Sequence, residues 1–226
     1  MFAGFIKMIW ILLKNTPVLS NLTFFLLRNS RYLFWRFRGP KEVQLGPANI
    51  KFIETVKREI GSDNNFKLIE FGCAAGPSLI ELAENYKSSK FFGFDIRKGA
   101  VEEGKIFLNH NRINNVTLFN SNLVDLNDEI SCDYIISRAT LIYLSPKDLR
   151  NLLSKIKTRV DKKIIFQEIH SFSNDSVNHY YFAHPFVKIF KELGYEEFFT
   201  ISMEKLNFER WDSKEWFGVN LILTRK

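Results

Sequence analysis

The residues best suited to chemistry form a short run of small residues directly after an apolar segment. Residues 67–71 are typical of a buried strand, and Gly72 and Gly76 follow them closely. Glycine permits backbone angles and close approaches that a side chain would forbid. Pro77 suits the first turn of a helix, because that turn does not use the N–H that proline lacks. The pattern therefore predicts a strand, a tight loop and a helix whose free N–H groups face a ligand.

A carboxylate one strand–helix unit further along is the second candidate for ligand binding. The apolar run 91–94 ends in Asp95. In a doubly wound fold, an acid at the end of this next strand can accept the hydroxyl groups of a ribose. Taken alone, Asp95 is equally suited to cap the next helix, and glycine suits many strand-to-helix turns. The loop and the acid together, in this order, favour a ligand that contains a nucleoside.

The spacing of the small residues distinguishes two classes of nucleoside-binding loop. A dinucleotide fingerprint, G-x-G-x-x-G, would need glycine where the chain has Ala74 and Pro77. The chain instead has Glu70 followed by Gly72, Ala74 and Gly76 at alternate positions. This pattern resembles motif I of the class I S-adenosylmethionine (SAM)-dependent methyltransferases, with Ala74 in place of the commoner middle glycine. An NAD-type enzyme remains the alternative at this point.

The resemblance covers approximately residues 48–226 and is most specific between Glu70 and Leu144. It implies that Glu70 and the small-residue loop face the methionine part of SAM, that Asp95 holds the ribose and that Ile96 lies against the adenine. Asn122-Leu123 stands where the family usually has Asp and an apolar residue near the adenine amino group, and 132–137 is similar to motif IV. The cofactor-binding residues that the resemblance implies are Glu70, Gly72, Ala74, Gly76, Asp95, Ile96, Asn122, Leu123 and Ser137.

The apolar pattern predicts alternating strands and helices, which is typical of a parallel sheet. The expected strands are 67–71, 90–95, 116–120, 132–137 and 162–168, and the expected helices are 48–60, 77–87, 98–110, 146–158 and 178–193. Two further runs, 197–203 and 216–224, have no helix between them and predict an antiparallel hairpin. The expected fold is α/β, a Rossmann-like three-layer sandwich. Its seven-stranded, mostly parallel sheet has a reversed C-terminal strand, and apolar helices precede it.

Two polar residues at the end of the fifth predicted strand are the candidates for acid–base catalysis. Glu168 and His170 are two positions apart, so they share a face while the chain stays extended. The unperturbed pKa of histidine lies near neutrality, so His170 is the first candidate for a general base. Glu168 would orient His170 or bind substrate hydroxyls. The alternative is a loop histidine without a role. No catalytic metal is expected, because the fourth strand ends in Ser137 and not in a carboxylate.

The charge distribution divides the chain into two parts. Seven of its 32 basic residues precede Glu42, the first acid, and the remaining basic residues balance the 25 acidic ones. The net charge of +7 therefore belongs to the N-terminal segment, and the neutral remainder is not expected to bind nucleic acid. Apolar runs followed by arginines and large aromatic residues suit a membrane interface. We expect residues 1–40 to be a monotopic anchor and residues 48–226 to be the catalytic domain.

Residues 1–40 have three alternative interpretations. A signal peptide is disfavoured, because no small-residue cleavage site follows the apolar run. A single bent transmembrane helix would have to bury Lys14, Asn15 and Pro17. A helical cap packed on the domain or on a second subunit stays open, because exposed apolar patches also mark protein interfaces.

These observations predict a SAM-dependent methyltransferase on the cytoplasmic face of a membrane. Cys73 and Cys132 both fall in predicted core elements, which favours a reducing compartment. The expected acceptor is a small molecule presented at the membrane, such as a lipid-linked saccharide, a quinone precursor or a phospholipid headgroup, and O-methylation of a saccharide is preferred. A catalytically silent subunit that docks a partner protein through its N-terminus is the alternative. The oligomeric state and the acceptor atom stay open.

Overall fold

The computed structural model describes residues 47–125, 131–172, 175–177, 181–206 and 215–226. The expected anchor, residues 1–40, lies outside these ranges. Among the helices that are described, none is both long enough and apolar enough to cross a membrane.

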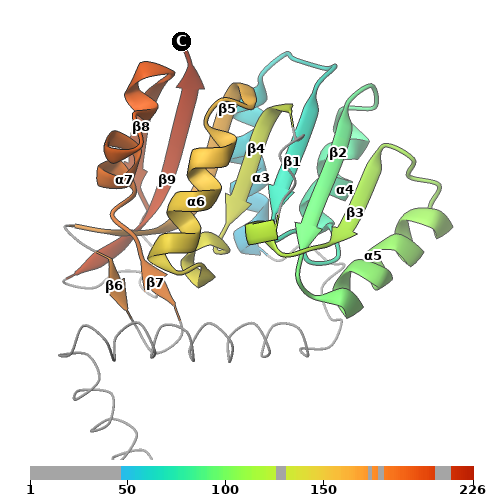
Figure 1. The fold of residues 1–226 in the computed structure, drawn as a ribbon. Coiled ribbons are helices and arrows are strands. Elements are labelled where there is room, and N and C mark those ends of the chain that lie inside the picture. Colours follow the sequence, from blue (N-terminus) through green and yellow to red (C-terminus); the bar gives the residue numbers. More distant parts are fainter. Residues whose placement is uncertain (1–46, 126–130, 173–174, 178–180, 207–214) are drawn as a thin grey trace, which may run out of the picture.

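A seven-stranded sheet with the order β3-β2-β1-β4-β5-β9-β8 forms the centre of the molecule (Figure 1). Its strands are β1 (Lys67–Phe71), β2 (Lys90–Asp95), β3 (Val116–Asn120), β4 (Cys132–Arg138), β5 (Val160–Ser171), β8 (Phe199–Lys205) and β9 (Trp216–Arg225). The pairs from β3 to β5 are parallel, whereas β9 runs antiparallel to both β5 and β8. The reversed strand is therefore β9, and the predicted sheet is confirmed.

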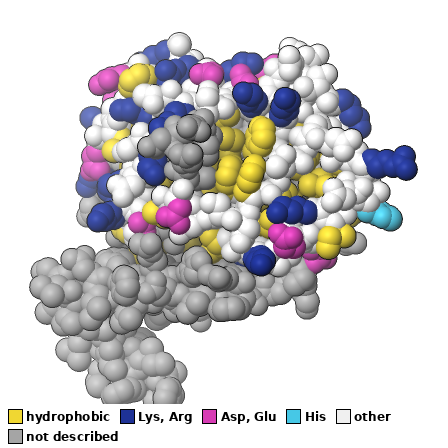
Figure 2. All heavy atoms as spheres, turned by 45° about the vertical axis from the view of Figure 1, so that its right-hand side comes forward, with side chains coloured by type: hydrophobic (Ala, Val, Ile, Leu, Met, Phe, Trp, Pro, Cys, Tyr) yellow, Lys and Arg dark blue, Asp and Glu magenta, His cyan; other side chains and the backbone are white. Residues whose placement is uncertain are grey.

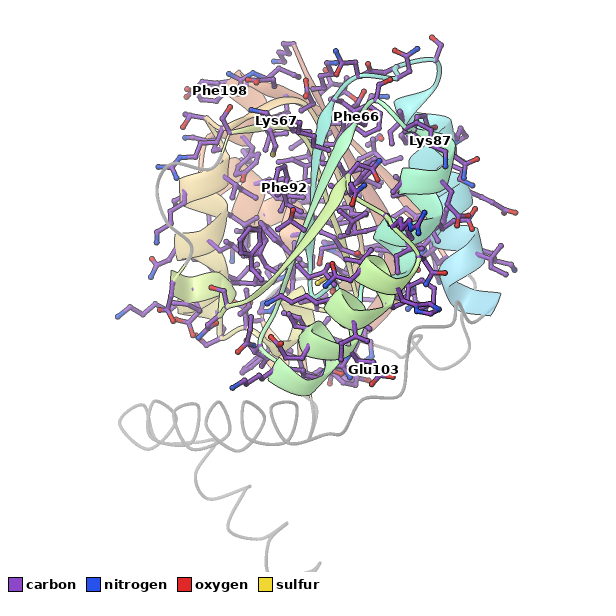
Figure 3. The ribbon with its side chains drawn as sticks, turned by 90° about the vertical axis from the view of Figure 1, so that its right-hand side faces the viewer. Phe66, Lys67, Lys87, Phe92, Glu103 and Phe198 are labelled. Atoms are coloured by element: carbon purple, nitrogen blue, oxygen red, sulfur yellow. The ribbon has the colours of Figure 1, made fainter. Side chains whose placement is uncertain are left out.

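Helices cover both faces of this sheet. On one face lie α3 (Pro47–Ile60), α4 (Pro77–Asn85) and α5 (Lys98–His110), and on the other lie α6 (Pro146–Ile156) and α7 (Phe186–Glu192). The described residues also form the short 3-10 helices η1 (Leu123–Asp125), η2 (Leu141–Tyr143) and η3 (Tyr195–Glu197). Seen from the β3 edge in Figure 3, the sheet separates α4 and α5 from α6. This is the three-layer sandwich that the alternation of strands and helices predicts.

The two faces of the sheet belong to two separate apolar cores. Successive residues of a strand point to opposite faces, and in β4 Ile135 joins the core under α6 and α7 whereas Ile136 joins the core under α3, α4 and α5. In β5, Phe166 and Ile165 divide in the same way. Both faces of the central strands are thus buried, and polar groups can remain accessible only at the strand ends.

The predicted helix over residues 178–193 is wrong over residues 181–185. Phe182–Ala183 form β7, which pairs with β6 (Ser176–Val177) just before this stretch, and α7 begins only at Phe186. The His184 N–H donates to the carbonyl of Ile169 at 3.4 Å, and the His184 carbonyl accepts from the Ser171 N–H at 3.0 Å. Pairing with the end of β5 therefore overrides the helical spacing of the apolar residues, a contact that local sequence does not reveal.

At the β2–β3 end of the sheet, the described helices cover one face and not the other. Between β3 and β4 the described residues form only η1. Phe92 and Phe94 are consequently half-buried, and Phe119 is 40% exposed and stacks on Phe94 with ring centroids 5.0 Å apart. Figure 2, which brings this side of the molecule forward, shows hydrophobic side chains gathered on the surface.

Candidate cofactor and acceptor site

The loop between β1 and α4 is built from residues with positive φ. Gly72, Ala74 and Gly76 have φ values of 74°, 54° and 83°. The N–H groups of Gly72 and Cys73 both donate to the carbonyl of Phe94, at 2.8 and 3.2 Å, which ties the loop to the end of β2. The left-handed conformation is unstrained for glycine and costs an alanine about 1–2 kcal/mol. The loop thus forms as the sequence predicts, with residual strain at Ala74.

Close backbone approaches hold this loop in place. A Cβ atom added to Gly104 of α5 would lie 2.3 Å from the carbonyl oxygen of Ala75. A Cβ added to Gly93 of β2 would lie 2.6 Å from the sulfur of Cys73. Both glycines therefore allow α5 and β2 to pack directly on the loop, and neither position tolerates a side chain without movement of its neighbours.

Asp95 joins the loop to the end of β2. Its Oδ2 accepts the N–H of Ala74 at 2.8 Å, and its Oδ1 accepts the N–H of Arg97 at 2.8 Å. The Nε of Arg97 lies 3.5 Å from the same Oδ1. Each carboxylate oxygen offers two acceptor positions, so Asp95 keeps capacity for further hydrogen bonds. The carboxylate is 8% exposed and stands at the carboxyl edge of the sheet.

Glu70 carries a buried oxygen that has no partner. The residue is 4% exposed, and its Oε2 accepts no hydrogen bond within the described part of the chain. Burial raises the pKa of Glu70 to about 8; the charge of Asp95 adds to the rise, whereas a hydrogen bond from Ser78 and the charge of Arg138 oppose it. A buried carboxylate oxygen without a partner is costly, and a cationic ligand group at Oε2 would remove this cost.

The residues at the end of β3 are differently exposed. Asn122 is half-buried, and its side-chain oxygen accepts the N–H of Val124 at 3.2 Å, which begins η1. Leu123 is 5% exposed and belongs to the core under α6. Ile96, directly after Asp95, is half-buried. These positions border the same carboxyl edge, although Leu123 points into the core.

Glu168 organises the loop that follows β4. Its Oε1 accepts the hydroxyl of Ser137 at 2.8 Å and the N–H groups of Thr140 and Leu141, each at 3.1 Å. Glu168 and Ser137 are both 0% exposed. Burial raises the pKa of Glu168 to about 7, although these hydrogen bonds lower it. Glu168 therefore holds the loop in position from beneath and does not face solvent.

His170 lies on the same face of β5 as Glu168, as the spacing predicts, but the two side chains do not interact. Glu168 Oε2 and His170 Nδ1 both lack a hydrogen-bond partner among the described residues. The His170 ring packs edge-on against Phe217 with centroids 5.4 Å apart, and the residue is 7% exposed. Burial lowers the pKa of His170 to about 4. The imidazole is consequently neutral near pH 7 and a weak base.

The loop after β4 touches the loop after β1. A Cβ atom added to Gly72 would lie 2.0 Å from the Oγ1 of Thr140, so the Thr140 side chain lies directly over Gly72. Ala139, which precedes Thr140, has a positive φ of 49°, and its N–H donates to the carbonyl of Gln167 at 2.9 Å. The carboxyl ends of β1, β4 and β5 are thereby brought together. Across the described residues, no group of three or more His, Cys, Asp or Glu side chains is placed to hold a metal ion.

Residues 68–163 match a family model described as "Methyltransferase domain". Among solved structures, the chain is similar to the geranyl diphosphate C-methyltransferase of Streptomyces coelicolor, crystallised with S-adenosyl-L-homocysteine (SAH) (TM-score 0.66, 11% identity, 94% of this chain and 99% of that chain). It is also similar to the magnesium protoporphyrin IX methyltransferase of Synechocystis with bound SAM (TM-score 0.63, 16% identity, 88% and 97%). Residues 68–163 thus match a methyltransferase domain, and the chain has the fold of the class I SAM-dependent methyltransferases. Both solved neighbours were crystallised with SAM or SAH, which is consistent with SAM as the cofactor.

Two uncharacterised proteins of Rickettsia prowazekii (strain Madrid E) are relatives in sequence. One is 30% identical over 96 residues, which is 42% of this chain and 17% of the relative. The other is 27% identical over 95 residues, which is 42% of this chain and 38% of the relative. The match thus spans less than half of either relative.

The residues of this methyltransferase domain fit SAM. The unpartnered Oε2 of Glu70 suits the ammonium of the methionine part. Asp95 keeps acceptor capacity for ribose hydroxyls. The individual roles of Glu70, Asp95 and the other proposed cofactor-binding residues stay predictions, as do the catalytic roles of Glu168 and His170.

Sequence reasoning missed three residues that shape the methyltransferase site. Thr140 covers Gly72, Arg97 binds Asp95 from the next helix start, and Gly104 admits the carbonyl of Ala75. Only Gly104 has a local signal, because a glycine inside a helical pattern often marks a close backbone approach. The contacts of Thr140 and Arg97 depend on the tertiary fold.

Proposed function

We propose that this methyltransferase domain transfers the methyl group of SAM to a hydroxyl of a small-molecule acceptor, a saccharide or another membrane-associated compound. The observation that carries the proposal is the contact of Thr140 with Gly72, because it joins the cofactor loop to the loop after β4. When bound, SAM supplies an electrophilic methyl group on a sulfonium. In the transfer a sulfur–methyl bond breaks, an oxygen–methyl bond forms, and the hydroxyl proton leaves to a base or to water.

The chain's own residues have three tasks in this proposal. Glu70 and Asp95 bind the charged and hydroxyl-bearing parts of the cofactor and fix its orientation. Glu168 fixes the loop that carries Thr140, so that an acceptor meets a preformed surface. His170 is neutral near pH 7 and can accept the hydroxyl proton only weakly. Alignment therefore contributes more than proton removal in this account.

Radiometric transfer from methyl-labelled SAM tests the proposal. Candidate acceptors are a lipid-linked saccharide, a free methyl glycoside, a phenolic quinone precursor and phosphatidylethanolamine vesicles. We expect label in an ether of a saccharide or of another membrane-associated hydroxyl compound, with equimolar SAH. SAH binding by the chain without label in any acceptor, together with co-purification of a partner protein, would support the silent subunit instead.

We also propose that residues 1–40 hold the domain at the cytoplasmic face of a membrane. Support comes from the sequence alone, in which seven basic residues without an acid accompany apolar and aromatic runs. Such a segment is attracted to anionic headgroups. The full chain should co-sediment with phosphatidylglycerol vesicles and bind phosphatidylcholine vesicles less, and a chain without residues 1–40 should bind neither. Equal sedimentation of both chains contradicts this proposal.

A further inference from the structure

A third, small apolar cluster lies beyond the carboxyl ends of β4 and β5. Its buried members are Ile142, Ile169 and Ala183, and it is separate from the two cores that cover the sheet. The partly buried residues that pack against it include Tyr143, Tyr181 and Trp216. We call these three aromatic residues the aromatic wall.

The aromatic wall is assembled from three segments that are distant in the sequence. Tyr143 ends η2, Tyr181 directly precedes β7, and Trp216 begins β9. The rings of Tyr181 and Trp216 meet edge to face at 6.3 Å and 85°. Trp216 pairs with Ser171 at the last position of β5, so the wall stands at the carboxyl edge of the sheet.

The wall lies close to the cofactor loop. Thr140 covers Gly72, and Tyr143 follows Thr140 by three positions. An extended chain spans about 3.5 Å per residue, so the Cα of Tyr143 lies within roughly 11 Å of the Cα of Thr140. Glu168 holds the start of this connection through the N–H groups of Thr140 and Leu141. The short segment 140–143 therefore connects the loop after β1 to the aromatic wall.

The chemistry of the wall indicates the kind of acceptor that it would bind. Three partly buried aromatic side chains offer flat apolar surfaces on which a ring can stack. None of the three carries a charge, so the wall favours an uncharged acceptor. We infer that Tyr143, Tyr181 and Trp216 bind the acceptor by stacking on the flat face of a six-membered ring. This inference rests on the proposed function and adds the acceptor's shape to it.

Saturation-transfer NMR on the SAH-loaded full chain tests the inference. The probes are methyl β-glucopyranoside and 4-hydroxybenzyl alcohol, which separate a sugar ring from an aromatic ring, and 1,4-butanediol as the acyclic control. We expect saturation to reach the ring protons of at least one ring probe and not the diol. In Trp216→Ala and Tyr181→Ala the affinity for that probe should fall roughly tenfold, as expected for the loss of aromatic stacking, whereas Trp216→Phe should retain most of it.

A matched control lies at the opposite edge of the sheet. Phe198, labelled in Figure 3, is a half-buried aromatic residue that packs against Lys157 and Arg225. Phe198→Ala should leave ring binding unchanged. No contact with either ring probe, or equal contact in wild type and Trp216→Ala, overturns the inference. SAH titration of the same samples keeps the two proposals apart, because a folded chain that fails to bind SAH contradicts the proposed function instead.

Discussion

The two halves of the sheet's carboxyl edge are built by different kinds of contact. At the cofactor half, formed by β1, β2 and the loop before α4, position depends on close approach at glycines: Gly104 meets the backbone of Ala75, and Gly93 meets the side chain of Cys73. At the acceptor half, formed by the ends of β4, β5 and β9, position depends on buried polar side chains. Glu168 and His184 are 0% exposed and His170 is 7% exposed.

The two halves should therefore be sensitive to different kinds of substitution. Close packing at glycines leaves little room for an added side chain, so the cofactor half should be sensitive to added atoms. Buried polar groups depend on their partners, so removed atoms are the perturbation to which the acceptor half is sensitive. The comparison can therefore be tested by adding atoms to one half and removing them from the other.

The largest effect is expected from Gly104→Ala in the cofactor half. The new Cβ would lie 2.3 Å from the Ala75 carbonyl oxygen, so α5 or the loop must move. Overpacking of this kind costs about 1–3 kcal/mol, and we expect thermal unfolding at lower temperature together with loss of SAH binding. Ile106→Ala is the control on the same helix, because Ile106 is 69% exposed and its change should be nearly neutral. Unchanged SAH affinity in Gly104→Ala would contradict the claim that close packing of α5 on the loop positions the cofactor half.

Removal of the Glu168 side chain should have the next largest effect. In Glu168→Ala the N–H groups of Thr140 and Leu141 lose their acceptor, which costs about 2 kcal/mol in unfolding free energy by the usual penalty for an unsatisfied buried donor. Glu168→Gln retains an oxygen acceptor and should recover most of this loss. Turnover with acceptor should fall more than SAH affinity in Glu168→Ala, which chemical denaturation and calorimetry together can measure. An equal loss in both would assign Glu168 to the cofactor half.

The pH dependence of SAH binding should separate Glu70 from the rest of the cofactor half. Burial raises the pKa of Glu70 to about 8, so at pH 6 the group is protonated and must lose its proton to meet the ligand ammonium. Affinity should therefore rise by up to about tenfold per pH unit between pH 6 and 7.5 and level off above pH 8, where Glu70 is already ionised. Proton release measured in two buffers checks the linkage. Glu70→Gln should bind SAH more weakly and with a flat profile; a wild-type profile without slope contradicts the role.

The smallest effect is expected at the two strained alanines, one in each half. Ala74 and Ala139 have φ values of 54° and 49°. Replacement by glycine relieves a cost of about 1 kcal/mol, although the greater freedom of glycine in the unfolded chain offsets part of it. Denaturant midpoints of Ala74→Gly and Ala139→Gly should stay level or rise slightly. Ala100→Gly, inside α5, should instead lose about 1 kcal/mol. If Ala74→Gly and Ala139→Gly lost as much stability as Ala100→Gly, neither position would be strained.

Local sequence predicted the cofactor half well for a physical reason. Its strands β1, β2 and β3 were predicted with the boundaries that the structure shows, because each is an apolar run bounded by turn residues. The small residues at positions 72, 74 and 76 predict the loop, because small residues allow the backbone conformations that it needs. These signals lie within a few residues of the structure that they specify.

The acceptor half was less predictable, because its structure depends on distant contacts. His184 adopts an extended conformation through pairing with β5, which the helical spacing of the surrounding residues conceals. The sequence correctly predicted that Glu168 and His170 lie at the end of β5. The burial of His170, however, depends on Phe217 from β9. The contact of Thr140 with Gly72 likewise joins two loops that no local pattern connects.

The central claim is that the carboxyl edge of β1 and β2 binds SAM, and calorimetric titration of SAH tests it most directly. The samples are the wild-type chain, Asp95→Ala and Asp63→Ala, with NAD as the control ligand. Asp63 also makes a charged contact, with Lys162, but at the opposite edge of the sheet. We predict that SAH binds wild type and Asp63→Ala, that Asp95→Ala loses this binding, and that NAD binds none of them. A folded wild-type chain that does not bind SAH, or an Asp95→Ala chain that binds it unchanged, would contradict the account.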